Sequence, residues 1–182
     1  AGSVGKPLIN TLVEIVDVET GTKVLGTGSQ GEIRVLGPQV MSGYRNRPTE
    51  TAETLRDGWL YTGDIGELDA SGNLYIRDRK KDMVIVSGYN VYPREIDEVL
   101  YLHIDVSDAA SVGISDEYRG EVICACVKLR KGSKTTSEDL IAFCKEHLAS
   151  YKVPRRISLL KAVPKTNIGK IDKAAVKKFL AS

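Results

Sequence analysis

One change of pattern along the chain limits its fold more than any other feature. Up to Arg77 the sequence reads as short strands separated by turns, whereas beyond the charged run Asp78-Arg79-Lys80-Lys81-Asp82 strand and helix patterns alternate. A charged run between two packed segments is typical of a linker, although a solvated turn has the same composition. The 182 residues suffice for one sizeable domain or two small ones. We therefore predict two units, residues 1–78 and 79–182.

The first predicted unit is rich in β-structure. Alternating apolar residues predict a strand over 12–18, and a second strand is expected over 32–36. The run Asp69-Ala70-Ser71-Gly72-Asn73 predicts the turn of a hairpin between two short strands. One short helix is expected over residues 49–55. This pattern indicates an all-β unit with a single helical insertion.

The second predicted unit contains three helices. Pro93 opens the first, because proline suits the first helical turn. Thr135 and Glu138 are expected to form the capping box of the second, which we expect Val153-Pro154 to end. Asp172 is expected to cap the third. Alternation of these helices with strands predicts a small α/β domain. The expected strands cover residues 105–114, 121–129 and 157–160.

The net charge of +2 is unevenly distributed. Nine lysines and arginines but only one acid lie between Lys152 and Lys178, so this segment carries +8 and the remainder of the chain −6. A basic C-terminal end suits anionic ligands such as phosphates, or an acidic surface. A solvated basic face without a partner would give the same count. Charge alone therefore leaves both interpretations open.

The three cysteines suggest no disulfide framework and no zinc site. Cys124 and Cys126 lie two apart in an apolar run, so on a strand they would share one face. We interpret them as packing residues in a reducing compartment. Since no apolar run is long enough to span a bilayer and no signal peptide is recognisable, the chain reads as a soluble, cytoplasmic protein.

Four short stretches carry residue types suited to nucleotide chemistry. Asp64, at the end of a short predicted strand, offers two carboxylate oxygens that can accept hydrogen bonds from both hydroxyls of a ribose. Gly88 permits a positive φ and the close approach of a ligand to the backbone. Lys170, on a loop rich in Pro, Thr, Asn and Gly, is a mobile charge for a phosphate. Each stretch alone also has an ordinary structural explanation. The stretches are Gly58–Asp64, Arg77–Asp82, Val86–Ile96 and Pro164–Asp172.

In this order and at this spacing, the four stretches resemble the C-terminal half of the adenylate-forming superfamily. This group includes acyl-CoA synthetases, 4-coumarate–CoA ligases, firefly-type luciferases and the adenylation domains of peptide synthetases. The resemblance covers nearly the whole chain, and residues 78–93 and 151–170 look most like bacterial long-chain fatty-acid CoA ligases. It implies an α+β fold: a small β-barrel-like subdomain, which ends a large N-terminal domain, followed by a small α/β lid domain with a mixed sheet and three helices.

The resemblance also implies a reaction in two halves. The acid first attacks the α-phosphate of Mg-ATP to give acyl-adenylate and pyrophosphate; the lid then rotates, and the thiol of CoA takes the acyl group and releases AMP. Asp64 matches the aspartate that binds the ribose hydroxyls, and Arg79 the arginine that assists it. Lys170 matches the lysine that enters the site during adenylation and bridges the acyl carboxylate and the α-phosphate.

Further positions follow from the same resemblance. Lys81 matches the hinge on which the lid pivots, where other members carry Asp. Gly88 and Tyr89 match the loop that replaces Lys170 after rotation and lines the pantetheine tunnel. Trp59 also matches the family pattern, and packing is its expected role. The basic residues near Lys152, Arg155 and Arg156 are expected near the CoA phosphates, although family members vary here.

The expected ligands are ATP, Mg²⁺, CoA and a fatty acid, without nucleic acid and without a metal site in this chain. The family's phosphate loop and most of its acyl pocket have no match here and are expected upstream of Ala1, so the chain reads as a fragment that activates no acid by itself. Two alternatives stay open: the same family with an aryl or short-chain acid, and a non-catalytic binding module. Long-chain substrates live in bilayers, which suggests peripheral membrane contact.

Overall fold

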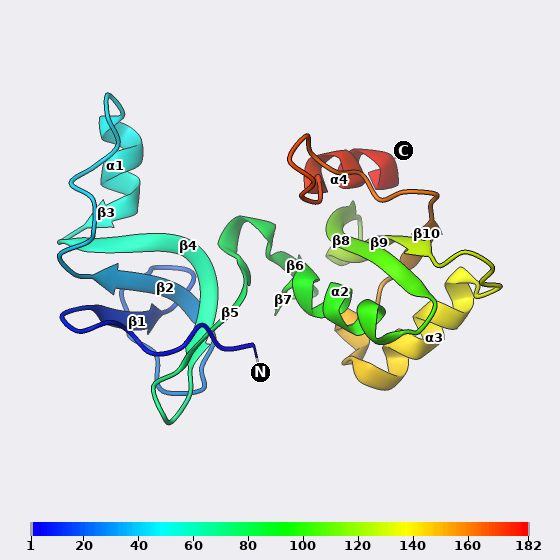
Figure 1. The fold of residues 1–182 in the computed structure, drawn as a ribbon, viewed down its shortest axis with the longest axis horizontal. Helices are drawn as coiled ribbons and strands as arrows, with labels where there is room; N and C mark the ends of the chain where they lie inside the picture. The colour runs from blue at the N-terminus through cyan, green and yellow to red at the C-terminus, as the bar shows by residue number, and fades with distance from the viewer. Residues whose placement is uncertain (1, 182) are drawn as a thin grey trace. The chain divides into compact units, whose positions relative to one another are not determined.

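The structure is a computed structural model that describes residues 2–181 (Figure 1). The chain divides after Lys81 into two compact units. The first unit holds one five-stranded sheet and the second unit holds another. The mixed α+β class expected from the sequence is confirmed. No helix within residues 2–181 is long and apolar enough to cross a membrane.

The first unit is an antiparallel sheet with one short helix. The strands lie in the order β1-β2-β4-β3, and β5 also pairs with β4. The sheet is a half-barrel, which confirms the barrel-like expectation, and β4 is strongly bent (Figure 1). Two register irregularities in the pairings of β4 with β2 and β5 account for this bend, because a β-bulge increases local twist. The elements are β1 (Leu12–Val16), β2 (Gly31–Leu36), α1 (Pro48–Thr54), β3 (Leu55–Arg56), β4 (Trp59–Leu68) and β5 (Leu74–Arg79).

The turns of the first unit are held by aspartates. The predicted strand over 12–18 ends at Val16, because the carboxylate of Asp17 accepts hydrogen bonds from the backbone N–H groups of Thr20, Thr22 and Lys23. These bonds divert the chain into a turn. The hairpin turn predicted over residues 69–73 is confirmed between β4 and β5.

The second unit is a mixed sheet with helices on both faces. The strands lie in the order β10-β9-β6-β7, and β8 also pairs with β9. Only β10 runs parallel to its neighbour β9, so the mixed sheet is confirmed, as are the three helices. The elements are a 3-10 turn η1 (Lys80–Asp82), which spans the boundary between the units, β6 (Val84–Val86), β7 (Tyr89–Val91), α2 (Pro93–Leu102), β8 (Val106–Asp116), β9 (Gly120–Leu129), α3 (Ser137–His147), η2 (Ser150–Lys152), β10 (Arg156–Leu159) and α4 (Lys173–Ala181).

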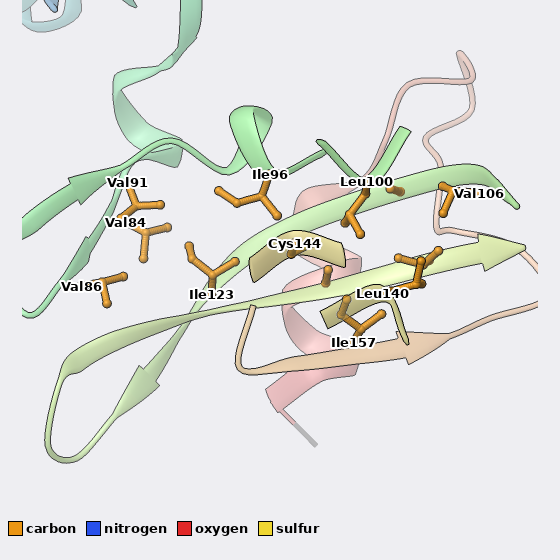
Figure 2. Packing of buried hydrophobic residues seen from close by; sticks show 13 residues of the cluster. Val84, Val86, Val91, Ile96, Leu100, Val106, Ile123, Leu140, Cys144 and Ile157 are labelled. Atoms are coloured by element: carbon orange, nitrogen blue, oxygen red, sulfur yellow. The ribbon is translucent and has the colours of Figure 1, made fainter. Parts of the chain in front are cut away.

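Strand β9 forms the centre of the second unit, because both of its faces are covered. Ile123, Ala125 and Val127 belong to a cluster with buried residues of α2 and α3. Figure 2 shows residues of this cluster from the strands and from both helices gathered together. Cys124 and Cys126 belong to the opposite cluster, which α4 covers, so the prediction that they share one face and pack is confirmed. A strand buried on both faces reads as one apolar run.

Two expectations for α3 are wrong: its capping box lies one residue further along the chain, and its C-terminal end lies several residues earlier. The capping box is Thr136 with Asp139, not Thr135 with Glu138: Thr136 Oγ1 accepts from the Asp139 N–H, and Asp139 Oδ2 accepts from the Thr136 N–H. Thr135 instead donates to the carboxylate of Asp105. The helix also ends at His147, before Val153-Pro154, because Leu148 is extended and packs against the core.

Candidate functional site

Asp64 and Arg79 lie directly opposite each other on neighbouring strands. They are paired residues of β4 and β5, and Arg79 Nε donates to Asp64 Oδ1 at 2.8 Å. The Asp64 side chain is 26% exposed and that of Arg79 59%. The pair is therefore oriented by backbone pairing and still open to a ligand. A carboxylate that binds one arginine through one oxygen keeps acceptor positions on the other.

A bulge in β4 sets the direction of the Asp64 side chain. On β2 a single residue, Ile33, lies between the paired positions 32 and 34, whereas on β4 Thr62, Gly63 and Asp64 lie between their partners. Gly63 has φ of 69°, which glycine adopts at little cost. Asp64 thus lies inside a ten-residue strand, not at the end of a short one as predicted. Bulges commonly redirect side chains at functional sites.

Thr62 stabilises this bulge and was missed as a functional candidate. Its Oγ1 donates to the carbonyl of Ile33 at 2.9 Å and accepts from the backbone N–H of Asp64 at 3.1 Å. One hydroxyl therefore satisfies two backbone groups that the bulge removes from the ladder. The only signal in the sequence is its place in the Thr-Gly-Asp triplet, which is also common in ordinary turns.

An ion pair with a buried carboxylate anchors the chain just before the boundary between the units. Glu32 of β2 is 5% exposed, and its Oε2 accepts from Lys80 Nζ at 2.7 Å. The next residue, Lys81, is exposed. A buried carboxylate without its cation is costly, so this pair holds Lys80 firmly against the first unit. No local pattern singles out Glu32, because its partner lies 48 positions away.

The guanidinium of Arg34 covers Trp59. Its Cζ lies 4.5 Å from the centre of the indole ring, while the same group donates to Glu14 and to the hydroxyl of Tyr61. Burial lowers the pKa of Arg34, but its bonds to Glu14 and Tyr61 outweigh this, and its pKa is raised. Trp59 is thus a packing residue of the β4 surface, as its sequence position suggested.

Gly88 and Tyr89 lie on the hairpin formed by β6 and β7. Val86 pairs with Tyr89, which leaves Ser87 and Gly88 as a two-residue turn with φ values of 51° and 84°. Positive φ at both positions is the geometry that favours glycine in such hairpins, which confirms the conformational expectation for Gly88. No atom lies within 4 Å of the place where a Gly88 side chain would start. The hairpin tip is therefore free to approach a ligand closely.

Tyr89 is braced by a second aromatic ring. Its ring stacks on Tyr151 with centroids 4.5 Å apart and planes 19° apart, although Tyr89 is 56% exposed. Beside this stack, a pocket of about 220 Å³ opens next to Ser87, and Arg119 and Arg155 both line it. Two arginines at one pocket suit an anionic ligand.

Of the three basic residues expected near the CoA phosphates, only Arg155 lines this pocket. Lys152 Nζ donates to both carboxylate oxygens of Glu95, at 2.8 and 2.7 Å. Arg156 donates to the carbonyl of Leu180 in α4. These two side chains therefore have intramolecular partners, which the charge count along the sequence could not reveal.

Lys170 lies on an exposed hairpin before α4. Lys165 and Ile171 form an isolated antiparallel bridge, and the Thr166 N–H donates to the Lys170 carbonyl at 2.7 Å. All residues from 166 to 170 are exposed. The hairpin thus presents the Lys170 ammonium group at the end of a narrow, solvated arm.

The cysteines of the chain pack in the apolar clusters of the second unit. The three cysteines are buried, and burial raises the pKa of the Cys144 thiol to about 11. Within residues 2–181, no group of three or more His, Cys, Asp or Glu side chains gathers as a metal site.

Comparison with known proteins places this arrangement in a family. Residues 1–45 match the family model of the AMP-binding enzymes, and residues 95–170 match that of the AMP-binding enzyme C-terminal domain. The long-chain-fatty-acid–CoA ligase of Bacillus subtilis (strain 168) is 50% identical over 170 residues, which cover 93% of this chain and 30% of that protein. The 2-succinylbenzoate–CoA ligase of Geobacillus sp. (strain WCH70) is 43% identical over 179 residues, 98% of this chain and 36% of that protein.

A solved structure gives the same result. ATP-bound MatB from Rhodopseudomonas palustris matches with a TM-score of 0.92 and 32% identity, over 100% of this chain and 36% of MatB. The chain thus spans about a third of the length of the proteins it matches. Because two successive family models and the similar proteins agree, the chain belongs to the AMP-binding, adenylate-forming enzymes and corresponds to the C-terminal portion of their acyl-CoA ligases.

Proposed function

We propose that this chain is the C-terminal part of a longer ATP-dependent ligase that adenylates a long-chain fatty acid and transfers the acyl group to CoA. The observation that carries the proposal is the Asp64–Arg79 pair at the β4 bulge, in a chain 50% identical to a long-chain-fatty-acid–CoA ligase. In this proposal the free acceptor positions of Asp64 bind the ribose hydroxyls of ATP. Arg79 holds the carboxylate in place.

The ammonium group of Lys170 acts in the first half-reaction. It bridges the acyl carboxylate and the α-phosphate oxygens as negative charge develops between them. An exposed hairpin suits this role, because the charge must enter a site formed by other parts of the ligase and leave it again. Magnesium accompanies the ATP phosphates, and no residue of this chain is assigned to it.

The second half-reaction uses the hairpin of β6 and β7. Gly88 and Tyr89 line the path of the pantetheine arm, and the Arg119 and Arg155 pocket beside the hairpin offers positive charge to the CoA phosphates. Residues 1–78 end the large domain, and residues 79–182 form the mobile lid. Support for a hinge at Lys81 comes from its exposure and from the ion pair of Lys80 with the buried Glu32 just before it.

A second acid class is favoured by one observation. A relative almost as similar as the long-chain ligases is a 2-succinylbenzoate–CoA ligase, 43% identical over 98% of this chain. The residues that would select the acid are expected outside these 182 residues. The same half-reactions would then act on an aryl acid, with Asp64 and Lys170 in unchanged roles.

The test is acid-dependent exchange of pyrophosphate into ATP by the full-length ligase. Palmitate, acetate, coumarate and 2-succinylbenzoate are compared at equal concentration. We expect exchange with palmitate and a palmitoyl-CoA product when CoA is added. Exchange with another acid alone would keep the mechanism and replace the substrate, whereas exchange with none would favour a non-catalytic binding module. The isolated 182-residue chain is expected to show no exchange.

Location follows from the proposed substrate. A ligase for long-chain acids acts in the cytoplasm and meets its acid at the inner face of the membrane, where such acids accumulate. Peripheral contact needs no spanning segment. Co-sedimentation of the full-length ligase with vesicles that contain palmitate tests this point.

A further inference from the structure

The hairpin that carries Lys170 has little core of its own. Its cross-strand contacts are the Lys165–Ile171 bridge and two backbone bonds, from Thr166 N–H to the Lys170 carbonyl at 2.7 Å and from Asp172 N–H to the Pro164 carbonyl at 3.0 Å. The tip from residue 166 to 170 is exposed throughout. An isolated two-stranded hairpin is only marginally stable, so its orientation depends on side-chain contacts with the rest of the domain.

The two ends of the hairpin are attached to the domain. Val163 is buried in the cluster beneath α4. Asp172 caps α4, because its Oδ1 accepts from the backbone N–H of Ala175 at 3.0 Å. These attachments fix where the hairpin begins and ends. Ile171, the bridged partner of Lys165, also packs against this cluster, whereas residues 165–170 are exposed.

One ion pair ties the exposed part of the arm to the sheet. Lys165 Nζ lies 2.6 Å from Asp108 Oδ2, and the Asp108 side chain is only 15% exposed. The other carboxylate oxygen, Oδ1, accepts from the hydroxyl of Tyr101 at 2.8 Å. A single carboxylate on β8 therefore joins the end of α2, through Tyr101, to the stem of the hairpin, through Lys165.

The charge state of Asp108 suits an ion pair that persists at neutral pH. Burial raises the pKa of this carboxyl group, but the bonds from Lys165 and Tyr101 outweigh burial and leave its pKa below the ordinary range. The carboxylate is thus charged at neutral pH. Tyr101 is in turn held by the backbone of Ala109, whose N–H donates to its hydroxyl at 3.2 Å. The ion pair is consequently built on two regular elements of the sheet-and-helix core.

Side chains alternate between the two faces of the hairpin, and this alternation relates the Asp108–Lys165 pair to Lys170. Lys165 and Ile171 are bridged partners, so their side chains share one face, which Lys165 turns toward Asp108. Lys170, the neighbour of Ile171, falls on the opposite face. The ion pair that holds Lys165 against the sheet therefore directs the Lys170 side chain away from the sheet.

We propose that Asp108, by holding Lys165, is a positioning residue that aims the Lys170 hairpin for the adenylation half-reaction. The proposal rests on the role of Lys170 in the proposed function. The bland alternative is a surface ion pair that adds only stability, since Lys165 is 46% exposed and such pairs contribute little. The two readings differ in which half-reaction responds.

The test compares both half-reactions in the full-length ligase. Asp108→Asn keeps the size of the side chain and an acceptor for Tyr101, and Lys165→Met removes the charge at similar length. Each variant is expected to lower adenylation by about 10- to 100-fold, since a misplacement of about 1 Å can have that effect. Thioester formation from supplied acyl-adenylate is expected to stay within about twofold of the unchanged ligase. Lys165→Arg, which still pairs with a carboxylate, is expected to restore most adenylation.

The matched control is Lys177→Met. Lys177 belongs to the same basic segment, and its Nζ lies 4.0 Å from Glu121 Oε1, but it lies in α4 and outside the hairpin. Both half-reactions should be unchanged in this variant. Equal loss of both halves in Asp108→Asn, full adenylation in that variant, or an equal effect of Lys177→Met would each overturn the positioning role. Absence of acid-dependent exchange in the unchanged ligase would instead refute the proposed function, so the two failures are distinguishable.

Discussion

The two units mount their candidate residues in different ways. In the first unit, Asp64 and Arg79 lie on adjacent hydrogen-bonded strands, and their side chains bind each other. In the second unit, Gly88 lies at the tip of a two-residue turn and Lys170 on an exposed hairpin. In the proposed mechanism, the first pair holds the nucleotide during both half-reactions, whereas each turn of the second unit serves one. Strands suit a constant contact, and exposed turns suit an alternating one.

The two units also differ in how much apolar surface their cores bury. The second unit has two apolar clusters, one on each face of its sheet, which stabilise the body that carries the turns. The first unit buries fewer apolar residues and relies in part on polar contacts such as the Lys80–Glu32 pair and the turn at Asp17. A solid core lets the second unit carry mobile groups without losing its fold.

The largest expected effect belongs to Lys170→Ala. At an effective dielectric constant near 20, a unit charge about 4 Å away is worth roughly 4 kcal/mol, or about three orders of magnitude in rate when it acts in the transition state. We expect adenylation to fall by that factor and thioester formation from supplied acyl-adenylate to persist. Lys178→Ala, an exposed lysine of α4, is the control. Loss of both halves would remove the distinction between constant and alternating groups.

Gly88→Leu should have the next largest effect, on the other half-reaction. The side chain would extend into the path assigned to the pantetheine arm, and we expect thioester formation to fall by about 100-fold, as a small misplacement at a reacting centre can cause. Adenylation should be preserved.

Gly132→Leu is the control for the effect of backbone strain. Gly132 has φ of 89° and open space around it, as Gly88 has, but it lies between β9 and α3. An equal loss of both half-reactions in Gly88→Leu, or the same loss in Gly132→Leu, would show that strain rather than the tunnel explains the result.

Asp64→Asn tests the constant contact in the first unit. A hydrogen bond to a charged group is worth about 1.5–3 kcal/mol, so we expect the KM for ATP to rise by at least about tenfold while kcat changes less. Asp57→Asn, at an exposed turn of the same unit, should leave KM unchanged. A selective loss in only one half-reaction would contradict the view that this pair serves both.

The smallest expected effect concerns the stability of the first unit and its dependence on pH. The backbone N–H groups of Thr20 and Lys23 hold the pKa of Asp17 well below its usual range. A carboxyl group with a lowered folded-state pKa stabilises the fold above its unfolded pKa, near 4, and loses this contribution as pH falls through the folded value. Asp17→Asn should therefore lower the melting temperature at pH 7, and the difference should shrink below about pH 4. An identical difference at pH 7 and pH 3 would argue against the mechanism.

Much of the secondary structure could be predicted because its signals are local. Such local signals are Pro93, the apolar run of β9 and the turn that begins at Asp69, and the elements they indicate are present. The capping box was misplaced by one residue, because Thr135 and Thr136 are both good caps and only the contact of Thr135 with Asp105 decides between them.

Partners distant in the sequence escaped prediction. The bulge at Gly63 depends on how β2 pairs with β4, and Glu32 is revealed only by Lys80 folding onto it. Likewise, nothing local distinguishes Lys152 and Arg156, which have partners within the fold, from Arg155, which lines a pocket. Charge can be counted along a chain, but its availability depends on what lies beside it.

The family resemblance, the α+β class and the order of the chemical stretches follow from the sequence, since motifs and hydrophobic periodicity lie in consecutive residues. Three further features depend on tertiary packing: Asp64 faces Arg79, the Ser87-Gly88 turn is open, and Asp108 holds the stem of the Lys170 hairpin. The physical reason is that strand register and ion pairing join residues far apart in the chain, and their geometry is settled by packing rather than by local preference.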